Sequence, residues 1–307
     1  MFSRRHPYLF FLLIFSTIVA ITVLGLSLMI VFSSKRKDFV EFGSGKSQVG
    51  VIEIKGVVSD PKTIIENIKR FRDEKSIKAI VLRIDSPGGA VGPAQEIYRE
   101  VRKASQKKPV IASLGTVAAS GGYYIAAGAD GIIANPGTIT GSIGVIMGFT
   151  NFQEVLRKIG LVPVVVKSGA YKDMGSPVRE MTAKEREILQ NLANKIHAQF
   201  VRDVALGRKM EKDILAPLAD GRIFTGEEAK DFGLVDRIGN LEDSIEWAGR
   251  KGGIEGKIVV VYAPEKRFSL IKYLFGTLFG QISELMLSPE YFSGHYSAGS
   301  TPFALSE

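Results

Sequence analysis

The 307-residue chain contains no cysteine, only three histidines and a single tryptophan. The missing cysteines exclude a thiol nucleophile, a cysteine-ligated zinc site and any disulfide. The histidines are His6, His197 and His295, and they lie far apart in the sequence. So few histidines leave little material for a Ser-His-Asp triad or for a metal site built from several imidazoles.

Long runs of one charge are also missing. The net charge is +8, from 40 basic and 32 acidic residues, and the two kinds are interleaved along the chain. A nucleic-acid-binding arm needs a concentrated basic patch. The charge pattern therefore indicates a solvated surface, and we expect no nucleic acid as partner.

One long apolar run is present at residues 8–32, and it carries no charge. About 20 apolar residues cross a bilayer, so the run is long enough to span one. Its length and the basic cluster that follows at 35–37 predict an uncleaved single-span anchor rather than a cleaved signal peptide. Basic residues at 4–5 and at 35–37 flank both ends. The positive-inside count leans slightly toward a cytoplasmic domain and does not settle the orientation.

Composition divides the chain into four parts. Residues 1–34 form the N-terminal tail and anchor, and the polar, glycine-containing stretch 35–48 is a linker. Residues 49–263 form the folded domain, and residues 264–307 form a C-terminal tail. Within the tail, the aromatic and apolar stretch 268–292 is open to three interpretations, namely an interfacial helix, a docked segment or disorder.

Strand and helix patterns alternate through the folded domain. Two capping boxes, at Thr182–Glu185 and Thr225–Glu228, predict helix starts. Alternation of this kind is typical of an α/β fold with a largely parallel sheet. The expected strands are 49–55, 78–84, 109–114, 131–134, 162–167 and 258–262, and the expected helices are 60–73, 93–105, one after residue 120, 182–206 and one from 225.

Ser120 stands out as a candidate nucleophile. It follows an expected strand, lies among small residues and precedes two glycines that begin a helix. Small neighbours allow a substrate backbone to approach the hydroxyl. The Gly121 amide, at the helix start, can point toward an oxyanion that develops on an acyl substrate.

A serine nucleophile needs a base, and the histidines are poorly placed for it. The mid-helix position of His197 favours a structural role. Lys172 lies in a loop rich in glycine, serine and proline (168–177), and a lysine can act as base when desolvation favours its neutral form. Its local sequence leaves a general base and an ordinary surface charge equally open. The turns at Gly89 and Ser142 are likewise open between a catalytic and a purely structural role.

Four motifs taken together resemble one family. The strings DSPGG (85–89), AASGGYYIA (118–126), TGSIGV (140–145) and SGAYKDMGSP (168–177) follow one N-terminal span in this order. The chain is similar in these motifs to the short form of the signal peptide peptidase A family, over about residues 48–250. Members of that family are membrane-anchored serine proteases with a Ser/Lys dyad and a ClpP/crotonase-like fold of repeated strand-strand-helix units.

The resemblance implies a role for each of five residues. Ser120 corresponds to the nucleophile and Lys172 to the general base. Ser142 corresponds to the serine that hydrogen-bonds the lysine, and the amides of Gly89 and Gly121 correspond to the oxyanion hole. Such a mechanism needs no metal and no organic cofactor.

The resemblance also implies where and with what the protein works. The expected substrates are remnant signal peptides and similar apolar peptides. The expected location is the bacterial cytoplasmic (inner) membrane, with the catalytic domain on the extracytoplasmic side. A homo-oligomeric ring or dome, in which neighbouring protomers share the dyad, is expected as well. Two alternatives of the same fold are a crotonase-like acyl-CoA enzyme and a scaffold without catalytic activity.

Overall fold

The computed structural model describes residues 6–35 and 47–264 of the chain. The predicted linker at 35–48 and the predicted C-terminal tail at 264–307 lie almost wholly outside the described residues. Their assignments therefore stay predictions.

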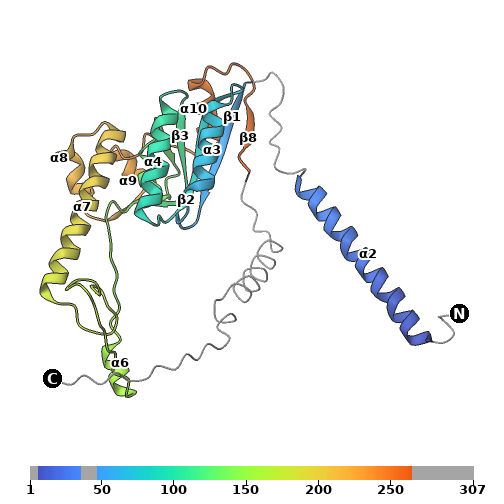
Figure 1. Cartoon of the computed structure of the whole chain (residues 1–307). Coiled ribbons are helices and arrows are strands. Elements are labelled where there is room, and N and C mark those ends of the chain that lie inside the picture. Colours follow the sequence, from blue (N-terminus) through green and yellow to red (C-terminus); the bar gives the residue numbers. More distant parts are fainter. Residues whose placement is uncertain (1–5, 36–46, 265–307) are drawn as a thin grey trace, which may run out of the picture. The chain divides into compact units, whose positions relative to one another are not determined.

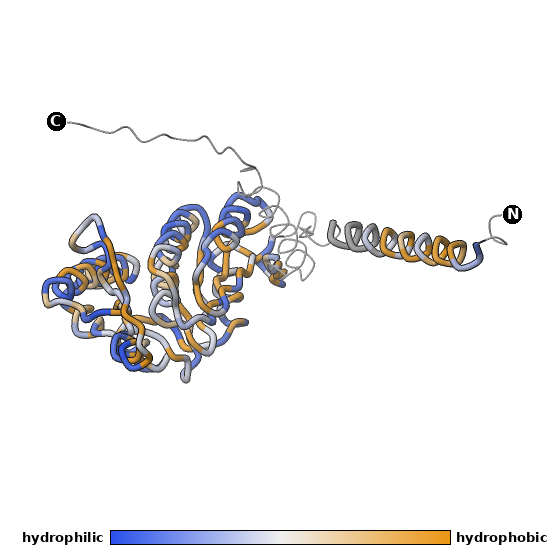
Figure 2. The backbone as a smooth tube through the Cα atoms, turned by 60° about the horizontal axis from the view of Figure 1, so that its bottom comes forward, coloured by the Kyte–Doolittle hydropathy of each residue, from blue (hydrophilic) through white to orange (hydrophobic). Residues whose placement is uncertain are grey.

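The apolar run forms one long helix, α2 (Pro7–Lys35). At 1.5 Å per residue, a helix of 29 residues is about 43 Å long. Its segment Pro7–Gly25 is long and apolar enough to cross a bilayer, by length and composition. Figure 2 shows the apolar residues along this helix in orange.

A single mostly parallel sheet organises the domain (Figure 1). Its strand order is β6-β5-β3-β2-β1-β8, and β4 pairs with both β3 and β7. Every pairing is parallel except that of β5 with β6. The strands are β1 (Gln48–Lys55), β2 (Ile77–Ser86), β3 (Val110–Ala119), β4 (Gly131–Ala134), β5 (Ile139–Gly141), β6 (Ile223–Thr225), β7 (Arg237–Ile238) and β8 (Val259–Tyr262).

Helices cover both faces of this sheet. Alternate residues of a strand point to opposite faces, and β2 follows this rule. Its Ile80 and Leu82 belong to a large apolar cluster with side chains of α3 (Lys62–Asp73) and α4 (Val91–Ser105). Val81 belongs to a second cluster, with side chains of α10 (Leu241–Lys251). The central strands are therefore buried on both sides, as expected of a parallel sheet.

The remaining helices all come after β3 in the sequence. Both predicted capping boxes are present, at the starts of α7 and α9. These helices are α5 (Gly121–Ala126), α6 (Gln153–Lys158), α7 (Ala183–Arg208), α8 (Lys212–Leu215), the 3-10 helix η1 (Ala216–Leu218) and α9 (Gly226–Asp231).

One predicted strand is wrong. Residues 162–167 have the β-branched composition of a strand, yet they form no ladder in the structure. Their valines are exposed, and Val166 is 97% accessible. A β-strand is stabilised by a partner strand that accepts and donates its backbone hydrogen bonds. Among the described residues, no such partner pairs with this segment.

Candidate active site

Ser120 lies at the sharp turn between β3 and α5. Its backbone has φ 51° and ψ −119°, a region that residues other than glycine rarely occupy. Two hydrogen bonds hold it there: the Ser120 amide donates to Gly141 O at 2.9 Å, and the Tyr124 amide donates to Ser120 O at 2.8 Å. A strained serine on a strand-to-helix turn presents its hydroxyl as the nucleophile elbow of hydrolases does. The sequence prediction that a helix begins directly after Ser120 is confirmed.

Gly89 is brought to Ser120 by a short pairing with Val58. The Val58 amide donates to Gly88 O at 2.8 Å, and the Ala90 amide donates to Val58 O at 2.9 Å. In a parallel bridge of this kind the residue in the middle, Gly89, has its own N–H on the side away from Val58. The approach is very close, because a Cβ added at Gly89 would lie 2.2 Å from Val58 O. Only glycine fits here.

The amides of Gly89 and Gly121 lie beside each other. A Cβ added at Gly121 would be 3.2 Å from Gly89 N, and one added at Gly88 would be 2.7 Å from Gly121 N. Within residues 47–264, neither amide donates a hydrogen bond to another residue. Two unused donors next to a serine hydroxyl can stabilise negative charge on a carbonyl oxygen.

An apolar pocket opens at Ser120. Its volume of about 20 Å³ has room for about one water molecule, so a substrate side chain must displace part of the lining. Phe200 of α7 stacks on Tyr124 at 4.4 Å between ring centroids and closes one side. The lining consists of Gly89, Val91, Ala94, Ser120, Gly121, Tyr124, Gly144, Val145, Ile196 and Phe200.

Ser142 lies next to this group, at the end of β5. Its neighbour Gly141 accepts the hydrogen bond from the Ser120 amide. Ser142 itself has φ 52° and donates its amide to Arg222 O at 2.8 Å. The half-buried side chain of Ser142 is therefore held next to Gly141, whose carbonyl oxygen accepts the hydrogen bond from the Ser120 amide.

Neither Ser142 nor Lys172 lines this pocket, but Ser142 adjoins Gly141, whereas Lys172 has no contact with the group around Ser120 among the described residues. It lies in an exposed turn, with its amide bonded to Gly169 O at 3.1 Å. This turn belongs to residues 146–181, which we call the arm. All arm residues are described and none is buried. The arm's one helix is α6, which Figure 1 labels, and none of its residues is buried.

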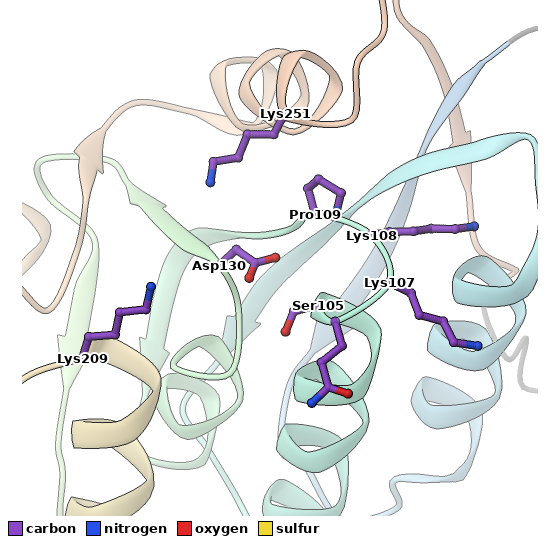
Figure 3. Close-up of a pocket in the computed structure, with 8 residues that line it drawn as sticks. Ser105, Lys107, Lys108, Pro109, Asp130, Lys209 and Lys251 are labelled. Atoms are coloured by element: carbon purple, nitrogen blue, oxygen red, sulfur yellow. The ribbon is translucent and has the colours of Figure 1, made fainter.

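A second group of lysines cannot replace Lys172. Figure 3 shows a pocket with Lys209 and Lys251 directed toward Asp130, while Lys108 extends away from it. Pro109, at the amino end of β3, also lines this pocket. Ser120 follows the carboxyl end of β3. Ten residues of strand separate the two places by roughly 30 Å.

Some residues of the site had no clear signal in the sequence. Ile196 and Phe200 line the pocket from α7, and their spacing of four marks one helix face. That spacing does not tell which cavity the face meets. The arm's ion pairs, centred on Arg179, were missed as well. Within the described residues, no group of three or more histidine, aspartate or glutamate side chains could hold a metal ion.

Two models of known protein families match the chain. A model of "Peptidase family S49" matches residues 102–255, and a model of "Clp protease" matches residues 48–139. The first range contains Ser120, Ser142 and Lys172, and the second contains Gly89. The Clp protease match and the mostly parallel sheet confirm the predicted fold class.

Individual relatives are similar over most of the chain. A Synechocystis protein named "Putative protease slr0021" is 42% identical over 235 residues, which cover 76% of this chain and 84% of that protein. An Enterococcus faecium protein named "Putative signal peptide peptidase SppA" is 33% identical, with 74% and 70% covered. "Serine protease SPPA, chloroplastic" of Arabidopsis thaliana is 32% identical, with 84% of this chain and 42% of that protein covered.

Proposed function

Because the chain belongs to peptidase family S49, we propose that it is a serine endopeptidase with Ser120 as nucleophile and Lys172 as general base. The observation that carries the proposal is the pair of unused amides, Gly89 and Gly121, beside a strained serine. An acyl-CoA enzyme of similar fold would not require the serine hydroxyl. The peptidase family and the serine geometry therefore favour proteolysis over that alternative.

The proposed reaction has two stages. Neutral Lys172 Nζ accepts the proton of Ser120 Oγ as that oxygen attacks a peptide carbonyl carbon. The resulting oxyanion accepts hydrogen bonds from the Gly89 and Gly121 amides, each worth about 3–4 kcal/mol in the transition state. The C–N bond then breaks, and Lys172 returns the proton to the leaving amine. In the second stage Lys172 accepts a proton from a water molecule as the water oxygen attacks the acyl carbon. The bond between that carbon and Ser120 Oγ then breaks, and Lys172 returns the proton to Oγ as the acid product leaves.

Lys172 must reach Ser120, and in this proposal it comes from a neighbouring copy. Two observations support a shared site. Lys172 does not line the pocket of its own chain, and the arm that carries it exposes many apolar side chains, among them Val164 and Val166. A cluster of several exposed apolar side chains is typical of an interaction surface. A ring of copies, in which Lys172 of each copy lies at Ser120 of the next, accounts for both observations. Ser142 then orients the incoming neutral amino group of Lys172.

The proposed substrates are apolar peptides at a membrane, in particular remnant signal peptides. The pocket beside Ser120 is lined mainly by apolar side chains, and α2 has the length and composition of a membrane anchor. An anchored enzyme meets such peptides where they reside. We place the enzyme in the bacterial cytoplasmic membrane with its domain on the extracytoplasmic side. Protease accessibility of the domain in spheroplasts tests this orientation, and protection of the domain contradicts it.

Mixing two inactive variants tests the shared dyad. Ser120→Ala and Lys172→Ala proteins are purified separately, co-refolded in equal amounts and assayed with an apolar fluorogenic peptide. In a head-to-tail ring assembled at random, about a quarter of all sites receive an intact serine and an intact lysine. We therefore expect recovery to about that fraction of wild-type activity.

Two results would overturn parts of the proposal. Full activity in the Lys172→Ala variant alone excludes this lysine as the base. Absence of recovery, when subunit exchange is verified by fluorescence transfer between labelled variants, excludes a site shared between copies. An acylating serine-hydrolase probe that labels wild type and fails to label Ser120→Ala separates an enzyme from a scaffold.

A further inference from the structure

The residue after the proposed base is an aspartate whose charge is fully engaged. Asp173 Oδ1 accepts hydrogen bonds from Lys167 Nζ at 2.6 Å and from Arg179 Nη2 at 2.9 Å. Asp173 Oδ2 accepts one from Arg179 Nε at 2.8 Å. The pairing with Arg179 is bidentate, which is the strongest and most directional form of a guanidinium–carboxylate contact. The Asp173 side chain is 14% exposed.

Arg179 is itself fixed from its other side by Glu185. Nη1 of Arg179 donates to Glu185 Oε2 at 2.9 Å, and Nη2 donates to Glu185 Oε1. Glu185 is the buried acidic member of the capping box that starts α7, and its Oε2 also accepts from the Thr182 amide at 2.9 Å. Arg179 thus ties the loop with Asp173 to the first turn of a long helix.

The charge states of these groups agree with the geometry. Hydrogen bonds from Arg179 and Lys167 hold the pKa of the Asp173 carboxyl well below its ordinary value. Hydrogen bonds from Arg179 and Thr182 lower the pKa of Glu185 to about 2. Both carboxylates are therefore ionised at every pH at which a peptidase of this kind works.

An ionised carboxylate next to the base is a problem for the reaction. Lys172 and Asp173 have Cα atoms about 3.8 Å apart, as all consecutive residues do, and Lys172 is exposed. A nearby opposite charge favours the protonated form of a lysine. A released Asp173 carboxylate would therefore hold Lys172 as an ammonium ion, which cannot accept the proton of a serine.

We propose that Arg179, held by Glu185, is a positioning residue that keeps the Asp173 carboxylate away from Lys172 and fixes the loop on which Lys172 lies. The inference rests on the proposed function, because it assigns Arg179 a role that requires Lys172 to be the general base. The charged groups that face Asp173 are Lys167 on the preceding segment, Arg179 on the following one and, through Arg179, Glu185 on α7. Glu180 and Arg186 line the adjoining pocket.

The test compares pH profiles of kcat/KM for the full-length wild type and Arg179→Met. Loss of the guanidinium removes two of the three hydrogen bonds that hold the Asp173 carboxylate and leaves the one from Lys167, so the acidic limb of the profile should move to higher pH by about one unit or more. At neutral pH this shift appears as a roughly tenfold lower kcat with little change in KM. A purely structural role for Arg179 would lower the amount of folded enzyme and leave the position of the limb unchanged.

A second substitution sharpens the assignment. The double variant Arg179→Met/Asp173→Asn lacks the carboxylate, so its acidic limb should return to the wild-type position. Arg186→Met is the matched control, because Arg186 is an exposed arginine of the same pocket with no ion pair among the described side chains. Its profile should equal that of wild type. Should Arg179→Met fail to fold, Arg179→Lys takes its place and should shift the limb in the same direction by a smaller amount.

The outcomes separate this inference from the proposed function. An unshifted limb in a folded Arg179 variant, or a limb that stays shifted in the double variant, overturns the role of Arg179 and leaves the dyad intact. Unchanged activity in Lys172→Ala overturns the dyad itself. Melting temperature verifies that each variant is folded.

Discussion

The serine half and the lysine half of the proposed site are held in different ways. Ser120 lies at the edge of a sheet buried on both faces, and backbone hydrogen bonds fix the residues on each side of it. Lys172 lies on the arm, where no residue is buried. There, ion pairs centred on Arg179 take the place of a packed core.

This difference shows which interactions fix the positions of the site residues in each half. A strained backbone persists only when its surroundings over-determine it, and a close-packed sheet edge supplies such surroundings at Ser120. The arm lacks a core of its own. Within one chain its loops are positioned by hydrogen-bonded charges, and its exposed valines remain available for contact with another surface. The residues of the proposed serine half are therefore positioned by the packed sheet, whereas those of the proposed lysine half are positioned by ion pairs.

The largest expected loss of activity comes from removing the nucleophile. Ser120→Ala should lower kcat by about 10⁴-fold or more, because the proposed mechanism has no other attacking group. Ser120→Gly should be equally inactive and more stable than Ser120→Ala by about 1–2 kcal/mol, since glycine adopts this backbone region without a steric penalty. Peptidase assays and urea unfolding measure both effects. Equal stability of the two variants would show that the backbone at Ser120 is not strained.

The next effect concerns the oxyanion donors. A Cβ at Gly89 would lie 2.2 Å from Val58 O, so Gly89→Ala should push the Gly89 amide out of place. We expect kcat to fall about 10²–10³-fold, the typical effect of losing one such donor. Gly92→Ala is the control, because a Cβ at Gly92 meets no atom within 4 Å. Its kcat should stay at the wild-type value. Equal activity of the two variants would contradict the assigned role of Gly89.

A third experiment contrasts the core with the arm directly. Ile111 is fully buried in the sheet, and Ile111→Ala should destabilise the domain by about 2–5 kcal/mol. The double change Val164→Ser/Val166→Ser alters exposed side chains and should change the monomer's stability by about 0.5 kcal/mol or less. The same double change should weaken self-association in sedimentation velocity. A loss of stability as large as that of Ile111→Ala would place these valines in a core and break the comparison.

The sequence predicted the serine half better than the lysine half, for physical reasons. Parallel strands end at one edge of a sheet, so a serine after β3 and a glycine turn after β2 can meet there. The local pattern made Ser120 a candidate nucleophile and left the turn at Gly89 open, and the family resemblance supplied its role. The strand predicted at 162–167 is wrong, because β-branched composition does not supply a partner strand. The three-residue strand β5, which holds the carbonyl that binds the Ser120 amide, is too short to give a periodic signal.

Ion pairs across a loop leave even less trace in a sequence. Asp173, Arg179 and Glu185 are six residues apart in succession, a spacing that matches no helix or strand period. Only the capping box that contains Glu185 had a recognisable pattern. The capping box at Asn240–Asp243, which starts α10, has the same kind of pattern and was missed.

The smallest predicted effect is the pH dependence of one buried carboxylate in the lysine half. The pKa of Glu185 is lowered to about 2 from an ordinary value of 4.5, chiefly by the hydrogen bond from Arg179. A carboxyl whose pKa falls on folding stabilises the folded state above the ordinary value, and this contribution is lost as the pH drops toward the lowered one. The junction of arm and α7 should therefore loosen between about pH 4.5 and pH 2, while the serine half stays protected.

Hydrogen exchange measured by mass spectrometry distinguishes the two halves in this pH window. Amides at 179–186 should lose protection on acidification, after correction for the intrinsic exchange rate, and those of β3 should not. Glu185→Gln should remove most of this pH dependence, because the side chain no longer titrates. Glu187→Gln is the control, since Glu187 pairs with Lys184 at the surface with both side chains about 60% exposed, and such pairs contribute little. If β3 and residues 179–186 lose protection together, the two halves unfold as one unit, and ion pairs do not hold the arm separately from the sheet.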